Sequence, residues 1–216
     1  MMNSSRITFF LLIVLLSVFP FNLLKAQDYY GSSYSHKRVS LGLTFSPNVS
    51  WLRYGNRATV DKKAEIGYGY GLLADFSLAE NYAFSTGFLI NNLKASSELG
   101  PDYASTTYDL QYVEIPFGLK LKSSQRYFRS YYGQFGFTGG IKMSADKTVE
   151  SEEKVDLGSA AKVFRLALQI GGGIEWQLDH NLRMMTGLTF NNGFKQVLRD
   201  GNAKNSYLAF NFGIFF

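Results

Sequence analysis

The sequence contains no cysteine, and its 216 residues include only four prolines and two histidines. Without cysteine the chain cannot form a disulfide, a thiolate metal site or the acylated anchor of a lipoprotein. The histidines, His36 and His180, lie in short polar stretches, and neither is placed to serve as the base for a nucleophile. We therefore expect no catalytic site, no metal site and no cofactor.

The first residues account for part of the positive charge. Met1 to Arg6 is short and basic, Ile7 to Phe19 is apolar, and Lys25-Ala26 precedes polar residues. This pattern is typical of a secretory signal peptide, which we expect to be cleaved after Ala26. A retained membrane helix is the alternative, because Ile7 to Leu24 is nearly long enough to span a bilayer.

The remaining chain shows no strong excess of one charge. Removing residues 1–26 takes away Arg6 and Lys25 and leaves 20 basic against 17 acidic residues. These charges are dispersed and form no basic stripe, so we expect no nucleic-acid partner.

The chain is rich in residues that favour strands and tight turns, with 19 phenylalanines, 14 tyrosines and 21 glycines. Alternation of residue type at every second position predicts eight strands, at 38–46, 65–78, 82–94, 108–122, 130–143, 162–178, 182–193 and 206–216. Connections after the odd-numbered strands are long, whereas those after the second and sixth are tight and that after the fourth is intermediate. An even strand number with this alternation is the plan of an outer-membrane barrel.

The two faces of these segments differ in chemistry. One face is bulky and apolar, as in Val39, Leu41, Leu43 and Phe45, while the other carries the charges and many glycines. A soluble barrel such as a lipocalin would bury the bulky face, which leaves little reason for so much glycine on the polar face. We therefore predict an eight-stranded antiparallel up-and-down transmembrane barrel at 38–216, after a signal peptide at 1–26 and a polar periplasmic segment at 27–37.

The charges on the inward face form a candidate structural network in the lumen. Burial forces opposite charges to pair, so we expect an ionic plug, with a gate or proton path as the alternative. Counting from the Asp179-His180-Asn181 turn predicts that Glu175 pairs with Arg183, and that Arg165 needs a separate acid such as Asp75 or Glu65. The predicted network consists of Glu65, Asp75, Glu114, Lys120, Lys142, Arg165, Glu175 and Arg183.

Other features concern the strand ends. Phe212, Ile214 and Phe216 alternate to the end of the chain and resemble the signal read by the outer-membrane assembly machinery. Pro116 removes a ladder donor from the fourth strand, so we expect a bulge there. An interfacial aromatic girdle is predicted at Tyr82, Tyr131, Trp176 and Phe216.

The stretch Tyr112-Val-Glu-Ile-Pro-Phe-Gly-Leu-Lys-Leu-Lys122 resembles the outer-membrane β-barrel family of Bacteroidota that includes PorT. Residues 39–52, 171–178 and 210–216 support the resemblance, which covers about residues 38–216. It implies a Gram-negative outer membrane and, through PorT, protein export by the type IX secretion system.

We expect a non-enzymatic, monomeric barrel that is a structural or interaction component of the cell envelope. The resemblance to the family of PorT adds the expectation that it is an accessory of protein export. Expected partners are outer-membrane lipid, the barrel-assembly machinery, and secretion-system or envelope proteins. A small-solute, porin-like channel is one alternative. The other is surface attachment or ligand binding through the long loops, with contacts from Trp51, Arg53, Tyr54, Tyr103, Tyr108 and Arg199.

Overall fold

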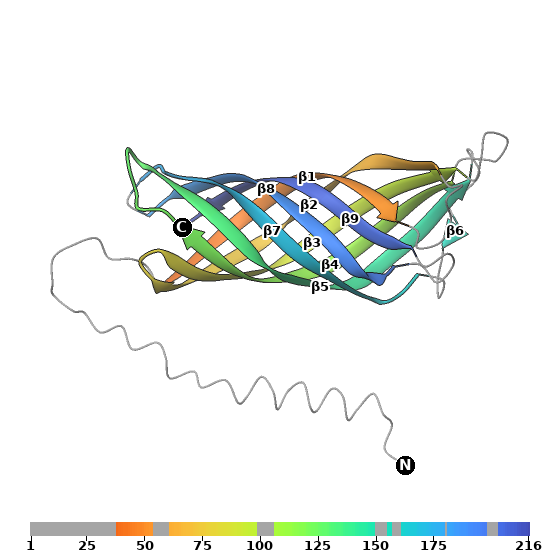
Figure 1. The fold of residues 1–216 in the computed structure, drawn as a ribbon, viewed down its shortest axis with the longest axis horizontal. Coiled ribbons are helices and arrows are strands. Elements are labelled where there is room, and N and C mark those ends of the chain that lie inside the picture. Colours follow the sequence, from red (N-terminus) through yellow and green to blue (C-terminus); the bar gives the residue numbers. More distant parts are fainter. Residues whose placement is uncertain are drawn as a thin grey trace, which may run out of the picture. The chain divides into compact units, whose positions relative to one another are not determined.

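The computed structural model describes residues 38–53, 61–98, 106–149, 155–156, 161–179, 181–197 and 203–216 (Figure 1). The expected signal peptide, the segment 27–37, and both histidines lie outside the described residues. The described residues form nine strands and contain no helix long and apolar enough to cross a membrane. The strands are β1 (Val39–Arg53), β2 (Asp61–Ala79), β3 (Tyr82–Glu98), β4 (Thr106–Lys122), β5 (Arg129–Val149), β6 (Val155–Asp156), β7 (Phe164–Gln177), β8 (Arg183–Gln196) and β9 (Lys204–Phe215).

Eight of these strands close into an antiparallel barrel, which confirms the predicted fold. Neighbours along the chain pair in order, β5 pairs with β7, and β9 returns to pair with β1 over Gly42↔Phe215 to Arg53↔Lys204. The two-residue strand β6 adds only to β5, opposite Asp146 and Lys147. Because the sheet is closed, each of these eight strands pairs with a neighbour on both sides. The described strands of the barrel therefore present no long edge with unpaired backbone N–H and C=O groups.

The barrel has two distinct ends. At one end, here called the turn end, lie the connections β2–β3, β4–β5 and β7–β8 and the C-terminus (Figure 1). At the other end, the loop end, lie the longer connections after β1, β3, β5 and β8. Because outer-membrane barrels have short periplasmic turns and longer extracellular loops, the turn end corresponds to the periplasmic side.

Strand β1 shows why the chain folds as a barrel of this kind. Its outward residues Val39, Leu41, Leu43 and Phe45 are 45–56% exposed, whereas Ser40, Thr44 and Ser46 between them are buried in the lumen. Successive side chains of a strand point to opposite faces, so this alternation gives an apolar exterior and a polar interior. The outward apolar face is the one that a bilayer covers.

Near the loop end the arrangement reverses on several strands. On β4, Leu110 and Tyr112 are fully buried inside, while Asp109 and Gln111 alternate with them on the outside. The buried apolar residues here form a cluster, the loop-end cluster, that consists of Leu52, Leu93, Ala95, Leu110, Tyr112, Ala145, Ala161, Val197, Ala203, Tyr207 and Ala209. This part of the barrel is therefore built like a soluble barrel, with an apolar interior and a partly polar exterior.

The structure corrects the sequence prediction at two points. Strands β1, β2, β3 and β5 extend several residues into the predicted loops, because the expected outward apolar pattern stops before the strands do. The predicted bulge at Pro116 is absent, since Pro116 pairs in register with Thr138. The irregularity lies instead in β5, where Met143 is an extra residue between the pairs Tyr112↔Lys142 and Gln111↔Ser144. Beyond it, side chains at odd-numbered positions of β5 face the lumen in place of those at even-numbered positions.

Candidate functional site: charge clusters in the lumen

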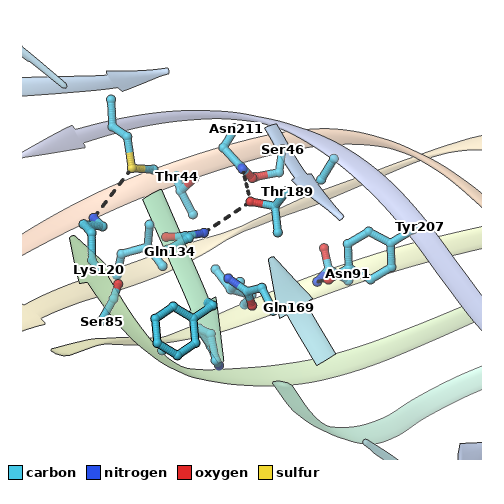
Figure 2. A pocket seen from close by; sticks show the side chains of 17 residues that line it. Thr44, Ser46, Ser85, Asn91, Lys120, Gln134, Gln169, Thr189, Tyr207 and Asn211 are labelled. Atoms are coloured by element: carbon cyan, nitrogen blue, oxygen red, sulfur yellow. Dashed lines mark hydrogen bonds between the residues drawn. The ribbon is translucent and has the colours of Figure 1, made fainter. Parts of the chain in front are cut away.

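A cavity of about 50 Å³, lined by both polar and apolar side chains (Figure 2), lies inside the barrel between the turn end and the loop-end cluster. Its wall includes the hydroxyl and amide groups of Ser46, Gln134, Thr189 and Asn211. Gln134 Nε2 and Asn211 Nδ2 both donate to Thr189 Oγ1, at 3.2 Å and 2.7 Å, and Ser46 donates to Asn211 Oδ1 at 2.9 Å. At roughly 10–15 Å³ for each water, the cavity has room for about three to five waters.

A group of five side chains, the central cluster, lies on the loop-end side of this cavity. Its members are Asn91, Glu114, Arg165, Asn191 and Tyr207. Arg165 Nη1 lies 2.6 Å from Glu114 Oε1, and both side chains are fully buried. The second carboxylate oxygen accepts hydrogen bonds from Asn91 and Tyr207, each at 2.7 Å. A buried ion pair needs such additional partners to offset its lost hydration.

The position of Gly140 explains why Glu114 and Arg165 can meet across an intervening strand. Glu114 of β4 pairs with Gly140 of β5, and Gly140 pairs with Arg165 of β7. A Cβ atom at Gly140 would lie 3.3 Å from Glu114 Cγ and 3.4 Å from Arg165 Cβ. The missing side chain therefore leaves the space over which the two charged side chains pack.

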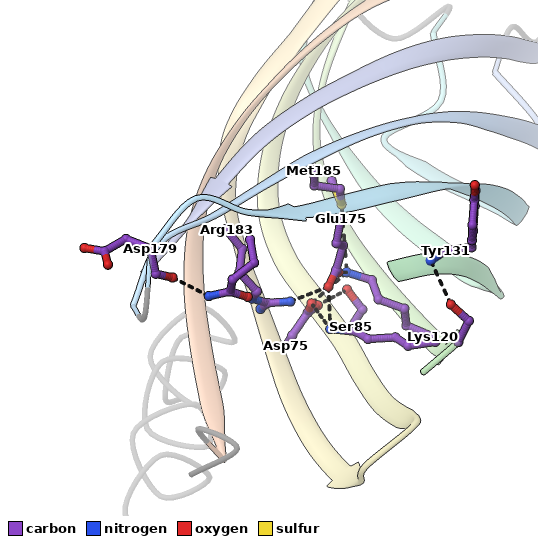
Figure 3. A network of polar contacts seen from close by, with 11 residues as sticks. Asp75, Ser85, Lys120, Tyr131, Glu175, Asp179, Arg183 and Met185 are labelled. Atoms are coloured by element: carbon purple, nitrogen blue, oxygen red, sulfur yellow. Dashed lines mark hydrogen bonds and ion pairs between the residues drawn. The ribbon is translucent and has the colours of Figure 1, made fainter. Parts of the chain in front are cut away.

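A second group, the rim cluster, closes the turn end (Figure 3). It consists of Asp75, Lys120, Lys122, Glu175 and Arg183. Lys120 Nζ lies 2.6 Å from Asp75 Oδ2 and 3.4 Å from Glu175 Oε1, while Lys122 Nζ lies 2.9 Å from Glu175 Oε2. Arg183 also contacts Glu175 Oε2. Glu175 is thus shared by three cations.

Aromatic rings cover the cations of the rim cluster from inside the barrel. The Lys120 ammonium lies 5.2 Å from the centre of the Tyr132 ring and 5.1 Å from that of Phe215. The Arg183 guanidinium lies 5.1 Å from the same Phe215 ring. Such contacts stabilise a cation that has lost water. The last inward side chain of β9 is therefore part of the closure at the turn end.

The structure brings together six of the eight residues predicted for the lumen network, in two separate groups. The expected contact between Glu175 and Arg183 is present. The expected partners of Arg165 were wrong, because Arg165 pairs with Glu114 while Asp75 binds Lys120. Glu65 and Lys142 lie apart from both clusters, where Glu65 accepts a hydrogen bond from Ser96 and Lys142 donates to the Ala161 carbonyl.

Sequence reasoning missed Lys122, Asn91, Asn191 and Tyr207. Lys122 could have been found, since it has the same parity as Lys120 two residues earlier in β4. The two asparagines and the tyrosine carry no charge, and only their proximity to Glu114 and Arg165 gives them a role.

Three of the six loop candidates lie in strands rather than in the predicted loops, and they make contacts within the barrel. Their part in surface attachment stays a prediction. The Trp51 ring stacks on Phe190 with centroids 6.2 Å apart, Arg53 donates to Asn192 and Gly193, and Tyr108 packs against the loop-end cluster. Tyr54, Tyr103 and Arg199 lie outside the described residues. Phe212, Ile214 and Phe216 are 45–51% exposed on the outer face, and their role in assembly stays a prediction.

The model of one protein family, described as outer membrane protein beta-barrel domain, matches residues 25–199. The chain belongs to this family. This outer membrane β-barrel protein accordingly resides in the bacterial outer membrane, where lipid covers its apolar exterior. A comparison with curated proteins found no match.

Solved structures similar to this outer membrane β-barrel protein include Neisserial surface protein A, at 10% identity over 82% of this chain and 97% of that chain, with a TM-score of 0.48. OprG from Pseudomonas aeruginosa is 10% identical over 86% of this chain and 99% of that chain, with a TM-score of 0.48. Ail from Yersinia pestis, solved with the heparin analogue sucrose octasulfate, is 13% identical over 83% of this chain and 99% of that chain, with a TM-score of 0.43. Similarities this distant carry no argument about function.

Proposed function

We propose that this barrel is a sealed, non-enzymatic component of the outer membrane that acts through protein contacts rather than by passing solutes. The observation that carries the proposal is the filled lumen. The rim cluster, the central cluster and the loop-end cluster follow one another along β4, at Lys120, Glu114 and Leu110. Between them the cavity of about 50 Å³ holds a few waters at most.

The rival is a small-solute channel, which the hydroxyl and amide groups in the wall of the cavity would suit. It would require a path through the fully buried Glu114–Arg165 pair and the apolar residues beyond it. Breaking such a pair without replacing it leaves an unpaired buried charge, which costs about 3–5 kcal/mol. Spontaneous opening is therefore a rare event in the proposed sealed barrel.

Planar-bilayer recording with the purified, folded barrel tests the seal. We expect no stable conductance steps from the wild-type protein. As a matched comparison, replacing Glu114, Arg165 and Leu110 together by alanine or glycine removes side chains from two of the three clusters, and we expect conductance to appear if that variant folds. Stable wild-type conductance on the scale of a general porin would overturn the proposal.

The finer proposal is an accessory role in protein export of the PorT-like kind, as a monomer with secretion-system or envelope proteins as partners. It is supported by the sequence resemblance around Tyr112–Lys122, and by a lumen whose filling suits an interaction role better than transport. A deletion strain tests it. We expect the deletion strain to lose surface cargo. The wild-type gene should restore export, and so should a variant with altered lumen charges that still folds. Intact export in the deletion strain would exclude this role and favour binding through the loops.

A further inference from the structure

The connection between β4 and β5 has an unusual backbone at the turn end of the barrel. Arg126 and Arg129 exchange backbone hydrogen bonds of 2.9 Å and 3.1 Å, which leaves Tyr127 and Phe128 as the two central residues of a tight hairpin turn. Their φ angles are 49° and 62°. A turn with positive φ at both central residues favours asparagine and glycine, because larger side chains strain the backbone there. Two aromatic residues at these positions call for a reason other than the turn itself.

The side chains of this turn are exposed to an unusual degree. Tyr127 is 88% and Phe128 is 74% exposed, the highest values of the aromatic side chains in the described ranges. The lipid-facing aromatic residues on the strands reach only 57%, at Tyr131. Two further exposed residues, Arg126 and Arg129, flank the aromatic pair, and the segment from Ser123 to Ser130 contains no acidic residue. The turn therefore presents two rings and two cations together.

The turn lies at a depth that matches the lipid headgroups. It extends from the end of the barrel where the chain terminates (Figure 1), three residues beyond the lipid-facing Tyr131. Three residues of a strand tilted by about 40° rise roughly 7 Å. The headgroup layer on each side of the hydrocarbon core is about 5–7 Å thick. With Tyr131 at the edge of the hydrocarbon core, the level at which tyrosines are enriched, the tip of the turn reaches the phosphates of the leaflet on that side.

We propose that the segment Arg126–Arg129 is a membrane anchor that binds the phosphate-rich surface of the periplasmic leaflet. Each guanidinium can donate two parallel hydrogen bonds to a phosphate. Tyrosine is enriched at this level of membrane proteins, because its ring faces apolar chains while its hydroxyl faces water, and the apolar ring of Phe128 can enter the acyl chains beside it. A protein partner is less well supported, since two side chains offer far less than the roughly 1,200 Å² that stable interfaces bury.

A single tryptophan at the turn tests the proposal in the full chain. The reporter is Phe128→Trp in a background of Trp51→Phe and Trp176→Phe, with Tyr127→Trp as a second reporter should the first fail to fold. The barrel is inserted into vesicles of phosphatidylethanolamine and phosphatidylglycerol, with or without bromine on the acyl chains near the glycerol. Iodide is supplied on both sides of the membrane.

We expect the tryptophan emission to be blue-shifted from that of tryptophan in water, quenched severalfold by the brominated lipids, and protected from iodide. Replacing Arg126→Gln and Arg129→Gln together should reduce the lipid quenching. Arg38→Gln, which alters another exposed arginine at the same end, should leave it unchanged. Emission like that of tryptophan in water, with strong quenching by iodide and none by the lipids, would overturn the anchor and leave the turn open to a periplasmic protein.

Discussion

Arg165 and Glu114 are both fully buried, so the stability of each charge depends on the other. The neutral partners Asn91 and Tyr207 bind Glu114, but they supply no positive charge. Removing one member of such a pair leaves the remaining charge in a medium of low polarity, which is much more costly than losing a pair at the surface. The Glu114–Arg165 pair is therefore the point in the lumen where a single substitution should have the largest effect.

We expect Arg165→Met to lower the free energy of unfolding by about 3–5 kcal/mol. Urea unfolding in detergent, followed by intrinsic fluorescence, measures the change. Lys94→Met is the matched control, because Lys94 and Asp109 are 3.7 Å apart and 43% and 28% exposed. Its expected effect is about 0–1 kcal/mol. Adding Glu114→Gln to Arg165→Met should recover part of the loss, and equal losses for Arg165→Met and Lys94→Met would contradict this account.

The rim cluster should respond unequally to its members. It holds three cations and two carboxylates, so Arg183→Gln leaves Lys120 and Lys122 balanced by Asp75 and Glu175. Glu175→Gln instead leaves three cations facing Asp75 alone. We expect Glu175→Gln to lower the urea midpoint substantially and Arg183→Gln to lower it little. The reverse order would mean that the contact between Arg183 and Glu175 dominates the cluster.

At the scale of the element, β5 contains one residue more than its partner β4 requires. Met143 lies between the pairs Tyr112↔Lys142 and Gln111↔Ser144, and its side chain is 55% exposed on the outside. The extra residue changes which parity faces the lumen, from Thr138 and Gly140 before it to Ala145 after it. Without Met143 the two parts of the ladder would join in one continuous register.

Deleting Met143 should therefore leave a folded barrel. The remaining pairs between β4 and β5 keep their register, and no core side chain is lost. Deleting Phe137, another outward residue of β5, should prevent folding, because residues 138–143 would each move to the opposite face, which places Lys142 against lipid and Ile141 in the lumen. Gel mobility of unheated samples after refolding in detergent distinguishes the two variants. Failure of the Met143 deletion alongside the Phe137 deletion would show that the bulge itself is needed.

At the scale of the whole molecule, the membrane covers only part of the strand length. The strands of the barrel contain 12–21 residues, whereas about 9–11 are enough to cross a bilayer when tilted. The reversed segment, with Leu110 inside and Asp109 outside, lies toward the loop end. The barrel therefore continues beyond the bilayer on the side of the long loops, where water covers its exterior and apolar residues fill its interior.

The absence of cysteine allows this boundary to be mapped by single substitutions. Ser144→Cys and Phe137→Cys both place a thiol on the exposed outer face of β5, on either side of Met143. In intact cells a membrane-impermeant maleimide should label Ser144→Cys, and it should label Phe137→Cys only after denaturation, because lipid covers that position. Labelling of Ser144→Cys only in lysed cells would reverse the assignment of the two ends.

The sequence by itself determined the barrel. Period-two alternation with the charges on one face and the bulky side chains on the other, as in Val39 to Ser46, has few other solutions, and the alternation of long and short connections agreed with it. This alternation is a local property of the sequence, since it can be recognised from the residues of one strand at a time. It failed where the exterior becomes polar, and there the strands extend beyond their predicted ends.

Only the tertiary structure decided which charges meet. Counting from a tight turn gave the relative heights of Glu175 and Arg183, because β7 and β8 are joined directly. Glu114 and Arg165 lie on β4 and β7, on either side of β5, and their relative heights depend on two registers, that of β4 with β5 and that of β5 with β7. A side chain in a narrow barrel can also reach across the lumen, as Tyr207 of β9 does to Glu114 of β4. The shear of the closed barrel fixes these distances, and no single strand carries that information.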